Sequence, residues 1–255
     1  MPPLLRALLT DLKAAALIGL PDTVYTALEA LRGLPEADLP TSALLPLGRA
    51  LTPLPADELR SLAQDADPVI RALAAAALGE QFALGKNITP ADLTVPASDP
   101  SPEVRLTLAG GLTGVHGGAA PSKDFLPLAD RWLATTTPAL LHTGLLLLPH
   151  THPAPEKLTA LLTPLHTLAE HDLRDTLLET LTALAQTGHT GTLLNLLDHW
   201  AAQPDPNIWL ITRALSANWA SGHSPQAIAI LQKLADNAGP LRAVRRAMER
   251  HKRNE

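Results

Sequence analysis

Histidines that stand near one another or near a carboxylate are the side chains of this chain best suited to chemistry. His150 and His152 lie two residues apart between prolines, and two imidazoles at that spacing can share a metal ion if an acidic ligand joins them. His166 and Glu170 are one helical turn apart, a spacing that can poise a general base. Exposed helices and loops carry such pairs routinely. We therefore predict solvated histidines, with no metal and no cofactor.

Sequence motifs for catalysis are missing from the 255 residues. There is no HExxH, no G-x-S-x-G elbow, no P-loop and no G-x-G-x-x-G. The absence of Cys excludes disulfides, thiolate–zinc sites and a cysteine nucleophile, and it fits a reducing cytoplasm. These observations predict a protein that is not an enzyme and that works in the cytoplasm.

Charge is distributed unevenly along the chain, whose net charge is −5. Residues 1–100 carry 7 basic and 12 acidic side chains, and residues 101–200 carry 5 and 9, whereas residues 201–255 carry 8 and 4. Most of the chain should repel a polyanion, but its basic end should attract an acidic partner. The candidate partner-binding residues are Arg242, Arg245, Arg246, Arg250, Lys252 and Arg253.

The segment 240–255 is predicted to be a basic helix that caps the fold. Leu241, Val244 and Met248 have the spacing of one helical face, which would pack on the preceding helices and leave the arginines outward. Two interpretations stay open for these arginines. They form either the solvated face of a capping helix, which we favour, or a dedicated binding site.

An internal repeat of about 34 residues organises the sequence. Residues 65–78, DADPVIRALAAAAL, match residues 99–112, DPSPEVRLTLAGGL, at an offset of 34. Continuing at intervals of 34 or 36 residues leads to Pro138, Asp172, Pro206 and Pro240, each followed by apolar residues at helical spacing. Proline suits the first turn of a helix because the amide that it lacks would be unpaired there. These positions are predicted helix starts.

Further apolar stretches lie between these starts and before the first of them, so that each repeat unit is a helix, a turn and a helix. Leu and Ala dominate the apolar residues, and both are good helix formers. Since a single pair cannot bury both of its apolar faces, neighbouring pairs should stack on a shared core. We predict an all-α, right-handed solenoid of about seven helical pairs in one domain, residues 1–255. The glycine-rich residues 113–122 should form a flexible loop, either a hinge or, as we favour, a plain surface loop.

The two matching segments resemble the second helix of HEAT repeats, in the wider armadillo-like class of helical arrays. The resemblance rests on the Asp-Pro turn, the following Ile-Arg or Val-Arg pair and the run of small residues, and it fades in the other units. It implies that Arg71 and Arg105, at equivalent positions, reach an aspartate in a neighbouring turn such as Asp65, Asp67 or Asp99. The alternative is an arginine ladder that reads phosphates, which the acidic surroundings disfavour.

A second resemblance, to HEAT-like DNA glycosylases that act on alkylated bases, supplies the alternative function. Those enzymes use a basic concave face, aromatic side chains and an essential carboxylate. The corresponding nucleic-acid site would be built from Trp200, Trp209, Arg213 and Trp219, with Asp205 nearby. An indole within a repeat helix is more often a core residue, and the acidic remainder of the chain would oppose DNA.

The sequence therefore predicts a non-catalytic scaffold or adaptor that binds a protein partner on the surface of the solenoid. Nucleic-acid binding at the basic end is the alternative. The amino-terminal residues superficially suggest a signal peptide, but Asp11 and Lys13 interrupt the apolar run. No apolar stretch approaches the roughly 20 residues that span a bilayer, so no membrane association is expected.

Overall fold

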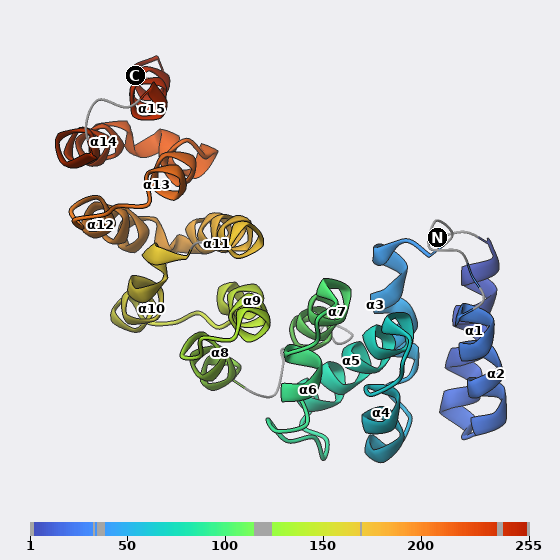
Figure 1. The fold of residues 1–255 in the computed structure, drawn as a ribbon. Coiled ribbons are helices and arrows are strands. Elements are labelled where there is room, and N and C mark those ends of the chain that lie inside the picture. Colours follow the sequence, from blue (N-terminus) through green and yellow to red (C-terminus); the bar gives the residue numbers. More distant parts are fainter. Residues whose placement is uncertain are drawn as a thin grey trace. The chain divides into compact units, whose positions relative to one another are not determined.

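The computed structural model describes residues 3–32, 34, 39–114, 124–168, 170–238 and 242–253. All regular secondary structure in these ranges is helical, as the sequence predicts. The chain divides into two compact units, Met1–Leu147 and Leu148–Glu255, which are described separately (Figure 1). A single domain over residues 1–255 stays a prediction. Residues 115–122 of the predicted flexible loop lie outside the described ranges.

The amino-terminal unit is a succession of helices that pack in chain order. Helices α3, α5, α7 and α9 contact one another consecutively, and α4, α6 and α8 each pack against the helix that follows or precedes them. The predicted helix starts at Pro68, Pro102 and Pro138 are confirmed as the first residues of α5, α7 and α9. The bounds are α1 Pro3–Ile18, α2 Pro21–Arg32, α3 Thr41–Ala50, α4 Ala56–Leu62, α5 Pro68–Ala83, α6 Thr94–Ala97, α7 Pro102–Thr113, α8 Leu126–Leu133 and α9 Pro138–Leu147.

The two turns that match in sequence also match in hydrogen bonding. The Oδ1 atom of Asp65 accepts the amide of Asp67 at 2.8 Å, and Oδ1 of Asp99 accepts the amide of Ser101 at 2.9 Å. Arg71 donates to the carbonyls of residues 65 and 66, and Arg105 donates to those of residues 99 and 100. The repeat is therefore a repeat of local structure at these two turns.

An ion pair links the two matching turns. Nε of Arg71 lies 2.7 Å from Oδ2 of Asp99, whose side chain is only 6% exposed. The hydrogen bond that Arg71 donates to Asp99 raises the pKa of Arg71, against the opposing effect of burial. The prediction that Arg71 reaches an aspartate in a neighbouring turn is confirmed. Arg105 differs, because its Nε lies 3.2 Å from Nδ1 of His142.

Small residues allow α5 to lie at the centre of this unit. Every residue from Ala72 to Gly79 is buried, as expected for a helix that is apolar all round. A Cβ atom on Gly111 of α7 would lie 2.2 Å from the carbonyl oxygen of Ala76, and one on Gly79 would lie 2.8 Å from that of Leu108. The α5 and α7 backbones thus touch almost directly, and glycine is required at both positions.

The carboxy-terminal unit has two layers. Helices α11, α13 and α15 contact one another in order and form one layer, while α10, α12 and α14 form the other (Figure 1). Gly188, with φ of +97°, ends the α11 segment in a backbone conformation that favours glycine and turns the chain into α12. The bounds are α10 Pro155–Leu162, α11 His171–Leu184, α12 Thr190–Ala201, α13 Ile208–Leu215, α14 Ser224–Ala238 and α15 Arg242–Lys252.

Two helix starts in this unit differ slightly from the sequence prediction. Helix α11 begins at His171, one residue before the predicted Asp172, and α13 begins at Ile208, two residues after Pro206. Asn207 caps α13 by accepting the amide of Leu210 at 3.1 Å, which explains the later start. Pro240 lies outside the described residues. Across the described ranges, no helix is both long and apolar enough to cross a membrane.

The contact between α5 and α7 yields a prediction for Gly111. Replacing Gly111 by Ala should destabilise the protein by about 1–3 kcal/mol, because the added methyl group forces two helix backbones apart. Gly191→Ala in α12 is the matched control, since its Cβ would have no neighbour within 4 Å. Urea denaturation followed by circular dichroism should show a lower midpoint for the first variant alone. Equal midpoints would contradict the requirement for glycine.

Asp92 yields a prediction about pH. Hydrogen bonds from Arg60, assisted by those from Thr89, lower its pKa from 3.8 to about 2. Because the folded-state pKa lies below the unfolded value, this stabilisation is complete above pH 4 and is lost as the pH falls towards 2. Asp92→Asn should cost about 1–2 kcal/mol at neutral pH and little near pH 2. Asp57→Asn, which removes the 93% exposed partner of the same Arg60, should cost less at every pH.

Candidate interaction surface

Helix α15 is anchored to the carboxy-terminal unit by one apolar face and a buried histidine. Val244, Ala247 and His251 are buried. The Nε2 atom of His251 lies 2.7 Å from the carbonyl oxygen of Leu215, to which it donates, and Nδ1 lies 3.2 Å from Oγ of Ser224. The sequence analysis placed Val244 on this face. It did not identify His251 as buried, because a histidine among arginines is expected on an exposed, polar face. The predicted capping helix is thus present over the described residues 242–252.

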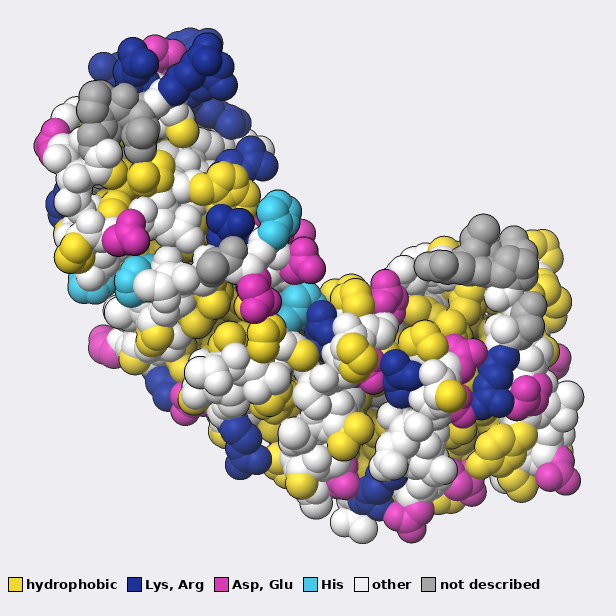
Figure 2. All heavy atoms as spheres, in the orientation of Figure 1, with side chains coloured by type: hydrophobic (Ala, Val, Ile, Leu, Met, Phe, Trp, Pro, Cys, Tyr) yellow, Lys and Arg dark blue, Asp and Glu magenta, His cyan; other side chains and the backbone are white. Residues whose placement is uncertain are grey.

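The basic side chains of α15 all face solvent. Exposed positions are Arg242, Arg245, Arg246, Arg250, Lys252 and Arg253, and Val244 and His251 lie on the opposite, buried face. Figure 2 shows Lys and Arg side chains gathered at the end of this unit, where Figure 1 places α15. None of the six forms an ion pair with another residue that the structure describes. The nearest acidic side chain in sequence is Glu249, whose backbone carbonyl accepts from Arg253.

Four arginines of the amino-terminal unit are used differently. Arg60 binds Asp57 and Asp92, and Arg71 binds Asp99. Arg32 binds Glu29 and Asp65, and Arg49 lies 3.7 Å from Glu80. These arginines tie neighbouring helices together. The positive charges of α15 have no such role within the described residues, so they are available to a ligand.

A groove crosses the layer that contains α15. It has a volume of about 480 Å³ and is lined by the carboxy-terminal parts of α11 and α13 and by the last turn of α15. Helix α13 ends at Leu215 after only 8 residues, while its neighbours have 14 and 11. The shorter middle helix leaves a hollow between two longer ones. Exposed Arg213 and Arg250 reach the groove from α13 and α15, and Glu179 lies on its α11 side.

A second open hollow, of about 650 Å³, extends this surface along α15. It is lined by Arg246, Glu249, Arg250 and Arg253. Arg250 belongs to both hollows. We call the two hollows together the basic groove. It combines three of the predicted α15 residues with Arg213, which sequence analysis had assigned to the alternative nucleic-acid site.

The three tryptophans of that alternative site are not brought together on one surface. Trp200 is completely buried in α12, and the indole nitrogen of Trp219 is buried as well. Trp209 is half-buried at the start of α13, where the guanidinium of Arg174 lies 5.1 Å from its ring centroid. Trp200 therefore serves as a core residue and cannot stack on a base.

The histidine pairs acquire no further ligands. His150 and His152 are both exposed, and burial of part of the imidazole, with the charge of His152, lowers the pKa of His150. The Nδ1 atom of His166 lies 2.9 Å from the carbonyl oxygen of Thr163. Within the described ranges, no three metal-ligating side chains lie close enough to hold an ion.

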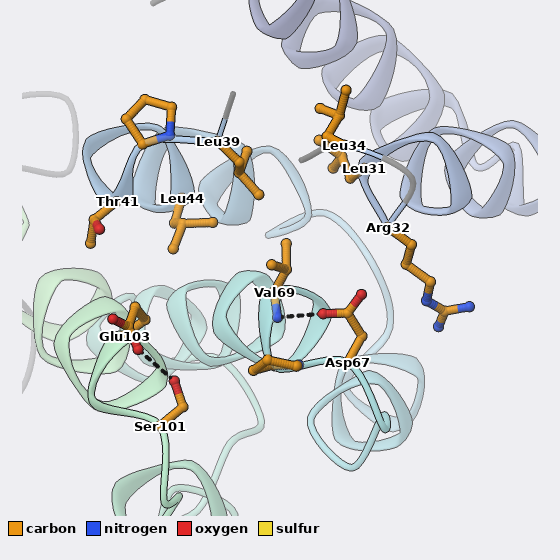
Figure 3. Close-up of a pocket in the computed structure, with 12 residues that line it drawn as sticks. Leu31, Arg32, Leu34, Leu39, Thr41, Leu44, Asp67, Val69, Ser101 and Glu103 are labelled. Atoms are coloured by element: carbon orange, nitrogen blue, oxygen red, sulfur yellow. Dashed lines mark hydrogen bonds between the residues drawn. The ribbon is translucent and has the colours of Figure 1, made fainter. Parts of the chain in front are cut away.

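The amino-terminal unit contains a different hollow, of about 510 Å³ (Figure 3). Leu31, Leu39 and Leu44 line it beside the first turns of α3, α5 and α7. Its carboxylates already have partners: Asp67 accepts the amide of Val69, and Glu103 accepts the hydroxyl of Ser101. The carboxylates of this hollow are thus hydrogen-bonded within the fold, and Arg32 is ion-paired with Glu29 and Asp65, so the basic groove is the stronger candidate.

No family model matches this chain, and no curated protein matches it significantly.

The anchor of α15 can be tested by changing His251. His251→Ala should destabilise the helix by about 2 kcal/mol, because the carbonyl of Leu215 loses its donor in a buried place. Trypsin should then cleave within α15 at least about tenfold faster, since cleavage follows local opening. His223→Ala, at an exposed position, is the control and should leave the rate unchanged. Equal cleavage of both variants would show that His251 does not hold the helix.

Proposed function

We propose that this protein is a non-catalytic interaction module that binds a protein partner through the exposed basic side chains of its last helix, α15. The observation that carries the proposal is the group of six exposed basic side chains, five on α15 and Arg253 directly after it, without ion pairs among the described residues. Like charges on neighbouring helical turns repel one another and so destabilise the free helix. An acidic partner would relieve this repulsion.

We further propose that the chain is a HEAT-like, right-handed solenoid of about seven helical pairs acting in the cytoplasm. Support comes from the equivalent turns at Asp65 and Asp99 and from the ordered packing of successive helices within each unit. Repeat stacks suit binding because they expose long surfaces without a deep catalytic pocket. The absence of Cys fits a reducing compartment.

Nucleic-acid binding at the same surface is the second candidate. The observation in its favour is again the unpaired positive charge of α15, since arginine also binds phosphate. The burial of Trp200 and the acidic residues of α11, Asp172, Asp175 and Glu179, count against it.

A pull-down from a lysate of the source cells tests the proposed function. Wild-type protein should retain a protein partner after nuclease treatment. A variant with Arg242, Arg245, Arg246 and Arg250 changed to Glu should lose it, because the surface charge is reversed. Changing the same four residues to Lys is the matched control, which keeps the charge and should keep most of the binding. Circular dichroism checks that the variants fold.

Two results would contradict the proposal. Retention of the same partner by the Glu variant would place the binding surface elsewhere on the protein. Recovery of nucleic acid alone, abolished by the Glu variant, would establish the second candidate instead. The two outcomes are separated by mass spectrometry of the captured material with and without nuclease.

A further inference from the structure

We infer that the basic groove binds an acidic segment of a protein partner whose apolar side chains enter the groove beside its carboxylates. This inference rests on the proposed function and specifies the chemistry of the ligand. It concerns the floor and both walls of the groove, whereas the proposed function depends only on the charge of α15.

The charge of the groove matches carboxylates at defined positions. Arg213 and Arg250 are exposed on adjacent helices and line the same hollow. A guanidinium presents a planar fork of donors that pairs with a carboxylate through two parallel hydrogen bonds. Neither arginine has an ion-pair partner among the residues that the structure describes. Two acidic side chains of a ligand can therefore be held at two separate points.

Part of the groove lining, which we call the floor, is apolar and lies beside the polar Thr182, Gln186 and Ser216, so it can take apolar side chains from the ligand. Leu178 and Ala183 line it from α11, and Ala214 and Ala217 line it from the end of α13. Leu178 and Ala183 are half-buried, so part of their surface remains open to water. Covering such a surface with an aliphatic side chain is favourable, whereas a phosphodiester chain offers nothing to cover it.

The position of the groove along its helices also favours a peptide over a nucleic acid. Its lining comes from the carboxy-terminal halves of α11 and α13 and from the last turn of α15. Helix carboxy-termini carry negative partial charge, whereas phosphates bind at amino-termini. The carbonyls of Ala214 and Leu215 at the end of α13 already accept hydrogen bonds, from the amide of Ala217 and from His251, so the arginine side chains are the groups offered to a ligand. Glu179 on the α11 wall adds a negative charge, which opposes a nucleic acid with a charge on every phosphate more than a peptide that carries only a few carboxylates.

The second hollow indicates in which direction the bound peptide segment extends from the first hollow. It continues from Arg250 to Arg246 and Arg253 along α15. A ligand whose apolar residues lie between α11 and α13 can place further acidic residues over α15. The predicted ligand is therefore a segment with leucine-like residues at one end or in its centre and carboxylates towards the α15 side.

Fluorescence polarisation with three labelled probes tests this inference on the full chain. The first is an acidic peptide rich in Glu with Leu at every third or fourth position. The second has the same charge but Gly in place of Leu. The third is duplex DNA of random sequence. We expect the Glu–Leu peptide to bind most tightly and to lose less affinity at high salt than the DNA, because salt screens its charge pairs but not its apolar contacts.

Four single variants locate the peptide in the groove. Arg213→Ala and Arg250→Ala should each weaken binding of the Glu–Leu peptide by about tenfold, the loss expected for one charged hydrogen-bonded pair. Glu179→Gln should tighten it about two- to threefold, because it removes a like charge from the wall. Arg131→Ala, an exposed arginine of α8 in the other unit, is the control and should have no effect. A variant that fails to fold would bind the peptide less tightly, so loss of folding cannot explain the tighter binding predicted for Glu179→Gln.

Several outcomes would overturn the inference. One is equal binding of the Gly peptide, which would show that the apolar floor is not used. Another is tighter binding of DNA than of either peptide. A third is unchanged affinity in Arg213→Ala and Glu179→Gln. The remaining case is a lysate partner whose binding is abolished by charge reversal on α15 but is unchanged in Arg213→Ala and Glu179→Gln. The proposed function then stands and this inference fails.

Discussion

Shared burial of apolar helix faces is the constraint on which the rest of this structure depends. The helices are rich in Leu and Ala, and most have more apolar surface than one neighbour can cover, so each packs against the helices before and after it. The tightest case is α5, where Gly79 of α5 and Gly111 of α7 let two backbones meet. With no disulfide available, this packing and a set of ion pairs between turns hold the amino-terminal unit together.

The two units use arginine for different purposes. In the amino-terminal unit Arg71 and Arg60 bind aspartates across neighbouring turns, so their charges are neutralised within the fold. In the carboxy-terminal unit the layer formed by α11, α13 and α15 leaves Arg213 and the arginines of α15 exposed. A charge that is paired inside a protein stabilises the structure, and one that is left unpaired on a groove is available for recognition.

The groove itself results from unequal helix lengths. Asn207 caps α13 at its start and the helix ends at Leu215, so the middle helix of the layer is the shortest. His251 then fastens α15 to the end of this short helix through the carbonyl of Leu215. The same contact that anchors the basic helix therefore sets Arg250 beside Arg213. One hydrogen bond, from His251 to the carbonyl of Leu215, therefore contributes both to the fold and to the candidate site.

The sequence by itself determined the helical class, most helix starts and the basic character of the last helix. Leu and Ala at helical spacing, proline at first turns and the clustered arginines are local signals, and local geometry is sufficient to interpret them. The resemblance to HEAT repeats implied the pairing of Arg71 with an aspartate, but it did not predict that the equivalent Arg105 contacts His142. Only the tertiary structure decided that Trp200 is a core residue and that Arg213 joins Arg250. Those outcomes depend on which helices become neighbours and on how far each one extends. Arg213 and Arg250 are 37 positions apart in the sequence, so no local pattern predicts that they line the same hollow.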